Sequence, residues 1–178
     1  MRTFFTTERL CRAGIIAALY TVLTYAFAPL AFGPFQIRPA EALCILPLFF
    51  VEAIPALYVG CMLSNLSSPF ALYDVPIGSL VTLIAAIGTY LVGKFFKKDV
   101  AKISLGGIFP VLFNALIIPI VIVFLTGGDE GYTSQAVAYF TFVASIFVTQ
   151  TVCIYGLGTP LYFALKKYRP TEKRNYRK

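Results

Sequence analysis

The sequence predicts an all-α integral membrane protein with six transmembrane helices, of which the second and third are short, and with both termini in the cytoplasm. One observation is composition: 58% of residues are hydrophobic and the mean hydropathy is +0.80, outside the range of soluble domains. A second is length, because a helix crosses a bilayer core with roughly 20 apolar residues. Four runs are of that order: residues 13–35, 78–93, 106–126 and 137–165. The third is the distribution of basic residues.

We expect the first run, 13–35, to be a membrane span rather than a secretory signal peptide, because it is long and lacks a clear cleavage pattern. The next part of the chain allows two interpretations. Two apolar runs of ten residues, 42–51 and 54–63, are separated by Glu52 and Ala53. They form either one broken span, giving five crossings, or two short helices, giving six.

Basic residues distinguish these topologies, because Lys and Arg concentrate on the cytoplasmic side of membrane proteins. Six crossings from a cytoplasmic N-terminus place fourteen of the 15 Lys and Arg residues inside, whereas the best arrangement with five crossings places twelve there. Six crossings are therefore favoured, and the net charge of +7 needs no nucleic-acid partner. We expect one domain over residues 1–178, with the spanning bundle at about 10–165 and a basic cytoplasmic tail at 166–178.

Arg38 is the basic residue left on the outer face, three positions before Glu41. A loop that enters the membrane at Gly33, Pro34 and Pro39 would place both side chains at the mouth of the bundle, where irregular backbone lines a watery cavity. A local ion pair is the simpler interpretation, but an exposed pair adds only about 0–1 kcal/mol. Ionisable groups at membrane depth are usually functional, so we interpret the couple as part of an outward-facing ligand pocket.

Four further polar positions are candidates for the same pocket, each with a structural alternative. Asn114 and Gln150 lie near the middle of their apolar runs and bond either to another helix or to a ligand. Asn65 is either a ligand contact or the C-cap of the third helix. Asp74 is either a pocket residue or a solvated turn residue before Pro76.

The remaining acidic residues of the apolar region are predicted to be structural. Glu52 falls in the turn before the third helix, where it would N-cap that helix. Asp129 and Glu130 fall in the glycine-rich segment 126–131 and are expected in a solvated turn. These three residues are therefore left out of the predicted pocket.

The chain lacks the usual parts of an active site. It contains no histidine, no paired carboxylates on one helix, and no Ser or Cys beside a candidate base, so we expect no catalytic residues and no enzyme activity. The four cysteines show no CxxC spacing, so neither a metal site nor a disulfide framework is expected. The two halves show none of the similarity that secondary transporters often carry. A small membrane protein with an outward pocket and no motor suggests a substrate-binding subunit that takes its energy from partners.

Faces of small residues indicate close helix packing, either within the bundle or against a partner protein. Ala13 and Ala17 are four apart in the first predicted helix, as are Gly14 and Ala18. A comparable stripe in the fourth predicted helix consists of Gly78, Thr82, Ala85 and Thr89. The residues alone leave both uses open.

Five segments together resemble the QueT family, proposed substrate-binding S components of energy-coupling factor (ECF) transporters that are assigned to queuosine precursors. The segments are residues 13–24 (AGIIAALYTVLT), 33–43 (GPFQIRPAEAL), 58–65 (YVGCMLSN), 74–80 (DVPIGSL) and 113–117 (FNALI). The resemblance covers about residues 10–165. It implies an S-component-like bundle, in which short helices in the first half are normal, in the plasma membrane (inner membrane) of a bacterium.

The resemblance also implies partners. S components assemble with a transmembrane coupling subunit and two cytoplasmic ATPases, which use the ATP, so this chain itself needs no cofactor. The AxxxA motif of S components, which docks on the coupling subunit, corresponds here to Ala13 and Ala17.

A queuosine precursor is a 7-deazaguanine, and the candidate residues complement that ring. The Glu41 carboxylate could accept its N1–H and its exocyclic amine together, and a neighbouring donor would serve its carbonyl oxygen. Phe35 or Tyr73 could stack on the ring. The donors considered for the carbonyl are Gln36, Arg38 and Asn114. The predicted ligand-binding set is Phe35, Gln36, Arg38, Glu41, Asn65, Tyr73, Asp74, Asn114 and Gln150.

Two rival functions stay open from the sequence. The first is an S component of the same fold for a different vitamin, such as riboflavin or thiamine, which comparative binding of vitamins and deazaguanines would reveal. The second is a non-transporting membrane scaffold in which Arg38 and Glu41 form only a structural clamp. Co-purification with two ATPase subunits would argue against the scaffold.

Overall fold

The computed structural model describes residues 6–31, 36–127 and 131–168, and the regular secondary structure of this part of the chain is entirely helical. The predicted all-α class is therefore confirmed for the described residues. The elements in order are α1 (Thr7–Ala26), α2 (Ala28–Ala31), the 3₁₀ helix η1 (Pro39–Leu48), α3 (Ala53–Asn65), α4 (Ala71–Tyr73), η2 (Asp74–Gly78), α5 (Ser79–Phe95), α6 (Asp99–Ile120), η3 (Val121–Leu125), α7 (Gln135–Thr151), η4 (Val152–Leu157) and α8 (Gly158–Tyr168). The segments η2, η3 and η4 are π-helical and continue their neighbours without a break.

Among the described residues, three continuous helices are long and apolar enough to cross a membrane: Ala71–Phe95, Asp99–Leu125 and Gln135–Lys167. They match the last three of the four long runs predicted from the sequence. The first run differs, because the Thr6 side chain accepts a hydrogen bond from the Arg9 amide and starts α1 well before the apolar stretch, and the helix ends at Ala26. Its first turns therefore carry charged side chains.

The short second helix predicted for residues 42–51 is the 3₁₀ helix η1, which begins at Pro39 and ends at Leu48. Pro47 explains the departure from α-helical geometry, since its ring would clash with the carbonyl four residues earlier in an α-helix. At about 2.0 Å per residue rather than 1.5 Å, ten residues in 3₁₀ form reach about 20 Å instead of about 15 Å. Every residue from Ala40 to Leu48 is buried, as expected of a helix that apart from Glu41 is apolar all round.

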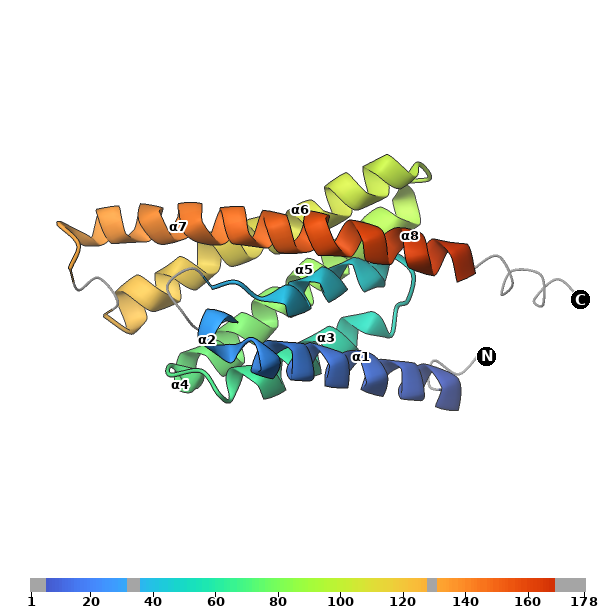
Figure 1. The fold of residues 1–178 in the computed structure, drawn as a ribbon, viewed down its shortest axis with the longest axis horizontal. Helices are drawn as coiled ribbons and strands as arrows, with labels where there is room; N and C mark the ends of the chain where they lie inside the picture. Colours follow the sequence, from blue (N-terminus) through green and yellow to red (C-terminus); the bar gives the residue numbers. More distant parts are fainter. Residues whose placement is uncertain (1–5, 32–35, 128–130, 169–178) are drawn as a thin grey trace, which may run out of the picture.

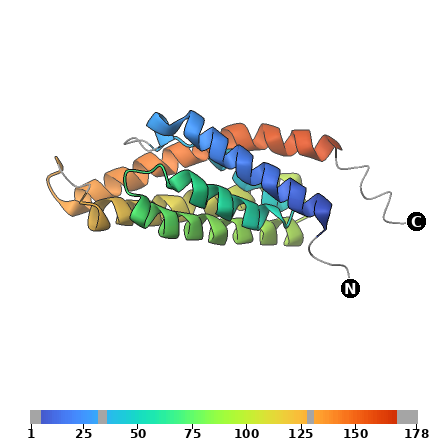
Figure 2. The same cartoon turned by 90° about the horizontal axis from the view of Figure 1, so that it is seen from below.

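Successive long elements run in opposite directions along the long axis of the molecule (Figures 1 and 2). The elements α1, α3 and α6 run away from the end of the molecule at which α1 begins. The elements η1 and α5, and the continuous helix of α7, η4 and α8, run back towards that end. The start of α1 and the end of α8 therefore lie at the same end. The central helix η1 contacts α1, α3, α5, α6, η4 and α8.

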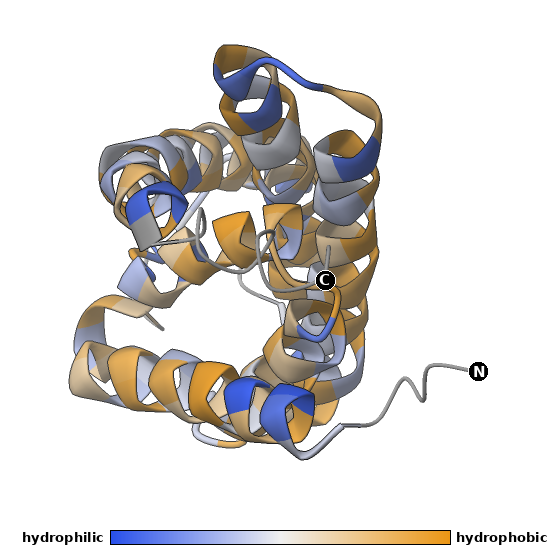
Figure 3. Ribbon diagram, turned by 90° about the vertical axis from the view of Figure 1, so that its right-hand side faces the viewer, coloured by the Kyte–Doolittle hydropathy of each residue, from blue (hydrophilic) through white to orange (hydrophobic). Residues whose placement is uncertain are grey.

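Polar and basic residues concentrate at that same end. Figure 3 looks onto it and shows hydrophilic residues at the start of α1, at the turn between α5 and α6, and at the end of α8. The end of α8 is fixed to the start of α6, because Asp99 forms an ion pair with Lys166 and accepts a 2.8 Å hydrogen bond from the Tyr162 hydroxyl. The basic residues of this end include Arg9, Arg12, Lys94, Lys97, Lys98, Lys102, Lys166 and Lys167.

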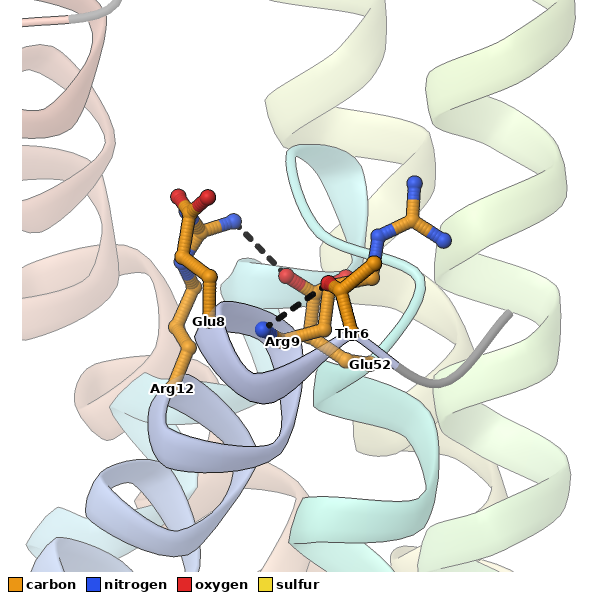
Figure 4. Close-up of polar contacts among 5 residues, drawn as sticks. All are labelled: Thr6, Glu8, Arg9, Arg12 and Glu52. Atoms are coloured by element: carbon orange, nitrogen blue, oxygen red, sulfur yellow. Dashed lines mark hydrogen bonds and ion pairs between the residues drawn. The ribbon is translucent and has the colours of Figure 1, made fainter. Parts of the chain in front are cut away.

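An ion-pair cluster joins α1 to the turn between η1 and α3 (Figure 4). The Arg12 guanidinium donates to Glu8 at 2.6 Å and to Glu52 at 2.7 Å, and it lies 4.6 Å from the centroid of the Phe50 ring. The prediction that Glu52 N-caps α3 is wrong: Glu52 stands at the N-cap position with helical backbone angles and makes no side-chain cap bond. The Glu52 carboxylate is buried. Because a buried charge is costly unless it is paired, Glu52 pairs with Arg12 instead of capping α3.

Helix α1 packs closely on α3, and Gly60 makes this approach possible. A Cβ atom at position 60 would lie 2.9 Å from Tyr20 Cβ and 3.0 Å from the Ala17 carbonyl oxygen. The first contact is closer than real Cβ atoms come, and the second is tighter than nine in ten such contacts and is made to backbone that cannot rotate away. The backbone of α1 at Ala17 thus lies close against α3 at Gly60.

We therefore expect Gly60→Ala to lower the free energy of unfolding by about 1–3 kcal/mol, the usual cost of overpacking a core. Thermal unfolding of the purified protein in detergent measures this change. Gly14→Ala is the matched control, since nothing lies within 4 Å of a Cβ at that helical glycine and alanine favours helix by about 1 kcal/mol. Equal melting temperatures for the two variants would contradict the packing described for Gly60.

Candidate ligand-binding site

A cluster of buried polar side chains lies inside the bundle, around the start of η1 and the end of α3. Five of the predicted site residues meet in it, from four separate elements and the segment before η1. Each is buried, although the surrounding chain is strongly apolar. They are Arg38, Glu41, Asn65, Asp74 and Asn114.

Glu41 is the centre of the cluster and is only 2% exposed. Its Oε1 accepts a short 2.6 Å hydrogen bond from the Tyr20 hydroxyl of α1. Its Oε2 accepts longer contacts from the Cys44 thiol at 3.2 Å and from Asn114 Nδ2 of α6 at 3.4 Å. Glu41 also lies in the first turn of η1, where the helix dipole favours a carboxylate. One oxygen is thus firmly held, whereas the other has weaker contacts that a better donor could replace.

Arg38 precedes η1 with an extended backbone (φ −117°, ψ 94°), because a residue before proline is disfavoured in the helical region. Its Nε donates to the Ala31 carbonyl at 3.1 Å and its Nη1 to Asn65 Oδ1 at 3.3 Å. The alternative of an exposed local ion pair is wrong, since Arg38 is 7% exposed and Glu41 is 2% exposed. The small energy of exposed ion pairs therefore does not apply to these two residues.

Asn65 connects Arg38 to Asp74. Besides accepting from Arg38, its Nδ2 donates to the Asp74 carbonyl at 2.8 Å. The alternative that Asn65 is a left-handed C-cap is wrong, because it is the last residue of α3 and the cap residue Leu66 has right-handed angles. A Cβ at Gly78 would lie 2.7 Å from Asn65 Nδ2, so this glycine leaves the room that the amide occupies.

Asp74 begins the π-helical segment η2 inside the continuous helix Ala71–Phe95. Its side chain is 7% exposed and its Oδ2 accepts a hydrogen bond from the Ser68 hydroxyl. The alternative of a solvated turn residue is therefore wrong. π-Helical segments within α-helices are frequent at functional sites, and this one directs a carboxylate into the protein.

Asn114 and Gln150 behave differently. Asn114 bonds to another helix through Glu41, as the structural alternative proposed. Gln150 is 4% exposed, and its Oε1 has no hydrogen-bond partner among the described residues. It lies on the buried face of α7 and η4, one turn before Cys153. The segment η4, to which Cys153 belongs, packs on η1.

Of the other predicted positions, two are half-buried and one lies outside the described residues. Tyr73 is half-buried, next to Asp74. Gln36 is half-buried and has a positive φ of 47°, a backbone conformation uncommon outside glycine. Phe35 lies outside the described residues, as do Asp129 and Glu130.

Three polar residues of the cluster escape the sequence prediction: Tyr20, Cys44 and Ser68. Tyr20 is fully buried in α1, and a buried tyrosine hydroxyl usually has a partner, so a tyrosine in the middle of an apolar helix is a usable signal. The thiol and the hydroxyl of the other two give no such signal, since small polar groups occur throughout membrane helices.

A second feature lies on the outside of the bundle, where α1 and α3 meet. An apolar hollow of about 240 Å³ there is lined by both residues of the predicted AxxxA pair, Ala13 and Ala17. Arg9 and Glu52 stand among its lining residues, next to the ion-pair cluster of Figure 4. By contrast, the small-residue stripe of α5 packs internally: its Thr89 hydroxyl donates to the Gly106 carbonyl at 2.7 Å.

The side chains of the cluster are suited to binding a ligand. Two carboxylates, a guanidinium and two side-chain amides can position a planar polar ligand through hydrogen bonds. Among the described residues, no group of three or more His, Cys, Asp or Glu side chains could hold a metal ion.

Comparisons with known proteins agree with the motifs of the sequence. The model of a family described as QueT transporter matches residues 10–167. The protein named Queuosine precursor transporter QueT from Lactococcus lactis subsp. cremoris (strain MG1363) is 39% identical over 88 residues, 48% of this chain and 51% of that protein. The alignment thus spans about half the length of this curated relative, and no solved structure matches. Since the family model covers most of the sequence, the chain belongs to the QueT transporter family.

Proposed function

We propose that this chain is the substrate-binding S component of an ECF-type importer and that it binds a 7-deazaguanine precursor of queuosine. The observation that carries the proposal is the buried polar cluster around Glu41 in a member of the QueT transporter family. Buried charges in an apolar bundle are expensive, and they are kept mainly where they serve a ligand or an ion. The name of the relative from Lactococcus lactis supplies the class of ligand.

In this proposal Glu41 recognises the base. Its Oε2, which has the longer contacts to Cys44 and Asn114, exchanges them for the N1–H and the exocyclic amine of the ring. Donors of the cluster serve the ring carbonyl, and an aromatic side chain stacks on the ring face. The full proposed set is Phe35, Gln36, Arg38, Glu41, Asn65, Tyr73, Asp74, Asn114 and Gln150.

The proposed topology is six crossings of a bacterial plasma membrane with both termini in the cytoplasm. The alternating directions of the elements and the common end of α1 and α8 support it (Figures 1 and 2). So does the collection of basic residues at that end, which the charge rule assigns to the cytoplasm. The polar cluster then faces the outer half of the bilayer, and the pocket opens outward.

Energy comes from partners in this proposal. The hollow between α1 and α3 is the docking surface for a transmembrane coupling subunit, through Ala13 and Ala17. Small residues allow close helix approach in membranes. Two cytoplasmic ATPases bound to the coupling subunit use the ATP, so the chain itself binds no cofactor and catalyses no reaction.

Isothermal titration calorimetry of the purified chain in detergent tests the proposal. We expect a 7-deazaguanine to bind, and riboflavin and thiamine not to bind at comparable concentrations. Binding of one of the vitamins instead would identify an S component of different specificity. Absence of binding to every one of these compounds would contradict a substrate-binding role.

A further inference from the structure

The α5–α6 turn, residues 94–102, combines four lysines within nine positions: Lys94, Lys97, Lys98 and Lys102. The first three are exposed, and Lys102 is half-buried. The turn has one acidic residue, Asp99, whose carboxylate is already bound to Lys166 and to the Tyr162 hydroxyl. In the part of the chain that the structure describes, no ion pair joins any of the four lysines to an acid. The turn therefore carries positive charge that the described residues do not neutralise.

Large apolar side chains lie between these lysines and are also open to the surroundings. Phe95 is 72% exposed and Val100 is 77% exposed, and Phe96 between them is exposed as well. Water is an unfavourable environment for these three side chains, and a hydrocarbon core is an unfavourable environment for the lysines. The headgroup layer of a bilayer suits both kinds, because aromatic and basic residues concentrate there.

The place of the turn in the fold favours a lipid over a partner protein. The turn joins the ends of two helices that are long enough to cross a membrane, Ala71–Phe95 and Asp99–Leu125. Phe95 also continues, at helical spacing, an exposed apolar stripe of α5 that consists of Leu80, Ile84, Ile87 and Leu91. Such a stripe on a membrane-spanning helix faces lipid, so Phe95 ends the lipid-facing surface at the point where the lysines begin.

We propose that the α5–α6 turn binds an anionic phospholipid, with lysine ammonium groups at the lipid phosphate and with Phe95 and Val100 between the upper parts of the acyl chains. Each lysine close to an anionic membrane surface raises affinity roughly fivefold. A zwitterionic headgroup carries its own positive charge and gains much less. This surface lies outside the polar cluster, so the inference is independent of the proposed function.

The absence of tryptophan from the sequence allows a direct test. Phe95→Trp places a single fluorescent reporter at the turn. The variant is reconstituted in phosphatidylcholine vesicles, and quenching by brominated phosphatidylglycerol is compared with quenching by brominated phosphatidylcholine of the same chain length. We expect the anionic lipid to bind at least about fivefold more tightly. Adding Lys97→Gln and Lys98→Gln should move this ratio towards one, as should 1 M salt, which screens charges beyond about 3 Å.

Phe140→Trp is the matched control for the reporter. Phe140 is similarly exposed, at 67%, and it lies near the start of α7, at the opposite end of the molecule from the α5–α6 turn (Figure 1). The sequence has no basic residue between positions 103 and 165. We therefore expect the two brominated lipids to quench a tryptophan at position 140 equally.

Equal binding of the two lipids at Phe95→Trp would overturn the proposal. Weak quenching by both lipids would also overturn it, because the turn would then lie outside the bilayer, where an acidic protein partner is the alternative. An unchanged ratio after the two lysine substitutions would exclude lipid recognition by charge. Native mass spectrometry of the wild-type chain needs no variant: phosphatidylglycerol should stay bound in preference to phosphatidylcholine, and equal retention would contradict the proposal.

Discussion

Glu41→Gln is expected to weaken the binding of a 7-deazaguanine by at least about a hundredfold while leaving the chain folded. The substitution keeps the size of the side chain but replaces an acceptor oxygen by an NH₂ donor, which then faces the donors of the ring. Hydrogen bonds to a charged partner contribute about 1.5–3 kcal/mol each, and truncating one partner of a buried charged pair costs about 2–5 kcal/mol. A hundredfold change corresponds to about 2.8 kcal/mol, within these ranges.

Calorimetry on purified Glu41→Gln measures the loss, and thermal unfolding verifies that the variant is folded. The Tyr20 hydroxyl, now 2.6 Å from the Glu41 oxygen, can still donate to the remaining amide oxygen, which helps to preserve the packing. Glu8→Gln, at an exposed position in the first turn of α1, is the control for the chemical change alone. An unchanged affinity for every 7-deazaguanine tested would contradict the role of Glu41.

Ala13→Leu is expected to abolish assembly with the coupling subunit, and with it uptake, without changing ligand affinity. Ala13 lines the hollow between α1 and α3, and a leucine there would occupy the space that a partner helix needs for close approach. The hollow and the polar cluster are separate features, so binding by the isolated chain should survive. Co-purification of the coupling subunit and ATPases with tagged Ala13→Leu measures the first effect, and calorimetry the second.

Ala18→Leu provides the matched control for Ala13→Leu. Ala18 is exposed on the same helix and is not among the lining residues of the hollow, so the same added volume should leave assembly intact. Full assembly and uptake by Ala13→Leu would show that the coupling subunit docks elsewhere. Loss of ligand binding in this variant would instead show that α1 and the polar cluster are linked.

The polar positions Arg38, Glu41 and Asn114 could be selected from the sequence because each stands out in an apolar surrounding. Their partners could not. Glu41 bonds to Tyr20, 21 residues away, and to Asn114, 73 residues away, and no local pattern encodes such pairs. The same limit explains the wrong role for Glu52: its cation, Arg12, lies 40 residues earlier, whereas capping is the option visible from neighbouring residues.

The helical class, the long apolar helices from Ala71 onward and the unequal distribution of basic residues follow from the sequence alone, because length, hydropathy and charge are properties of single segments. Packing, by contrast, makes η1 a buried central 3₁₀ helix, buries Arg38 and Glu41, and brings Asn65 to Asp74. The physical reason is that a buried polar group must find its partner wherever packing brings one within hydrogen-bond distance. That distance depends on how whole helices pack, which no single segment specifies.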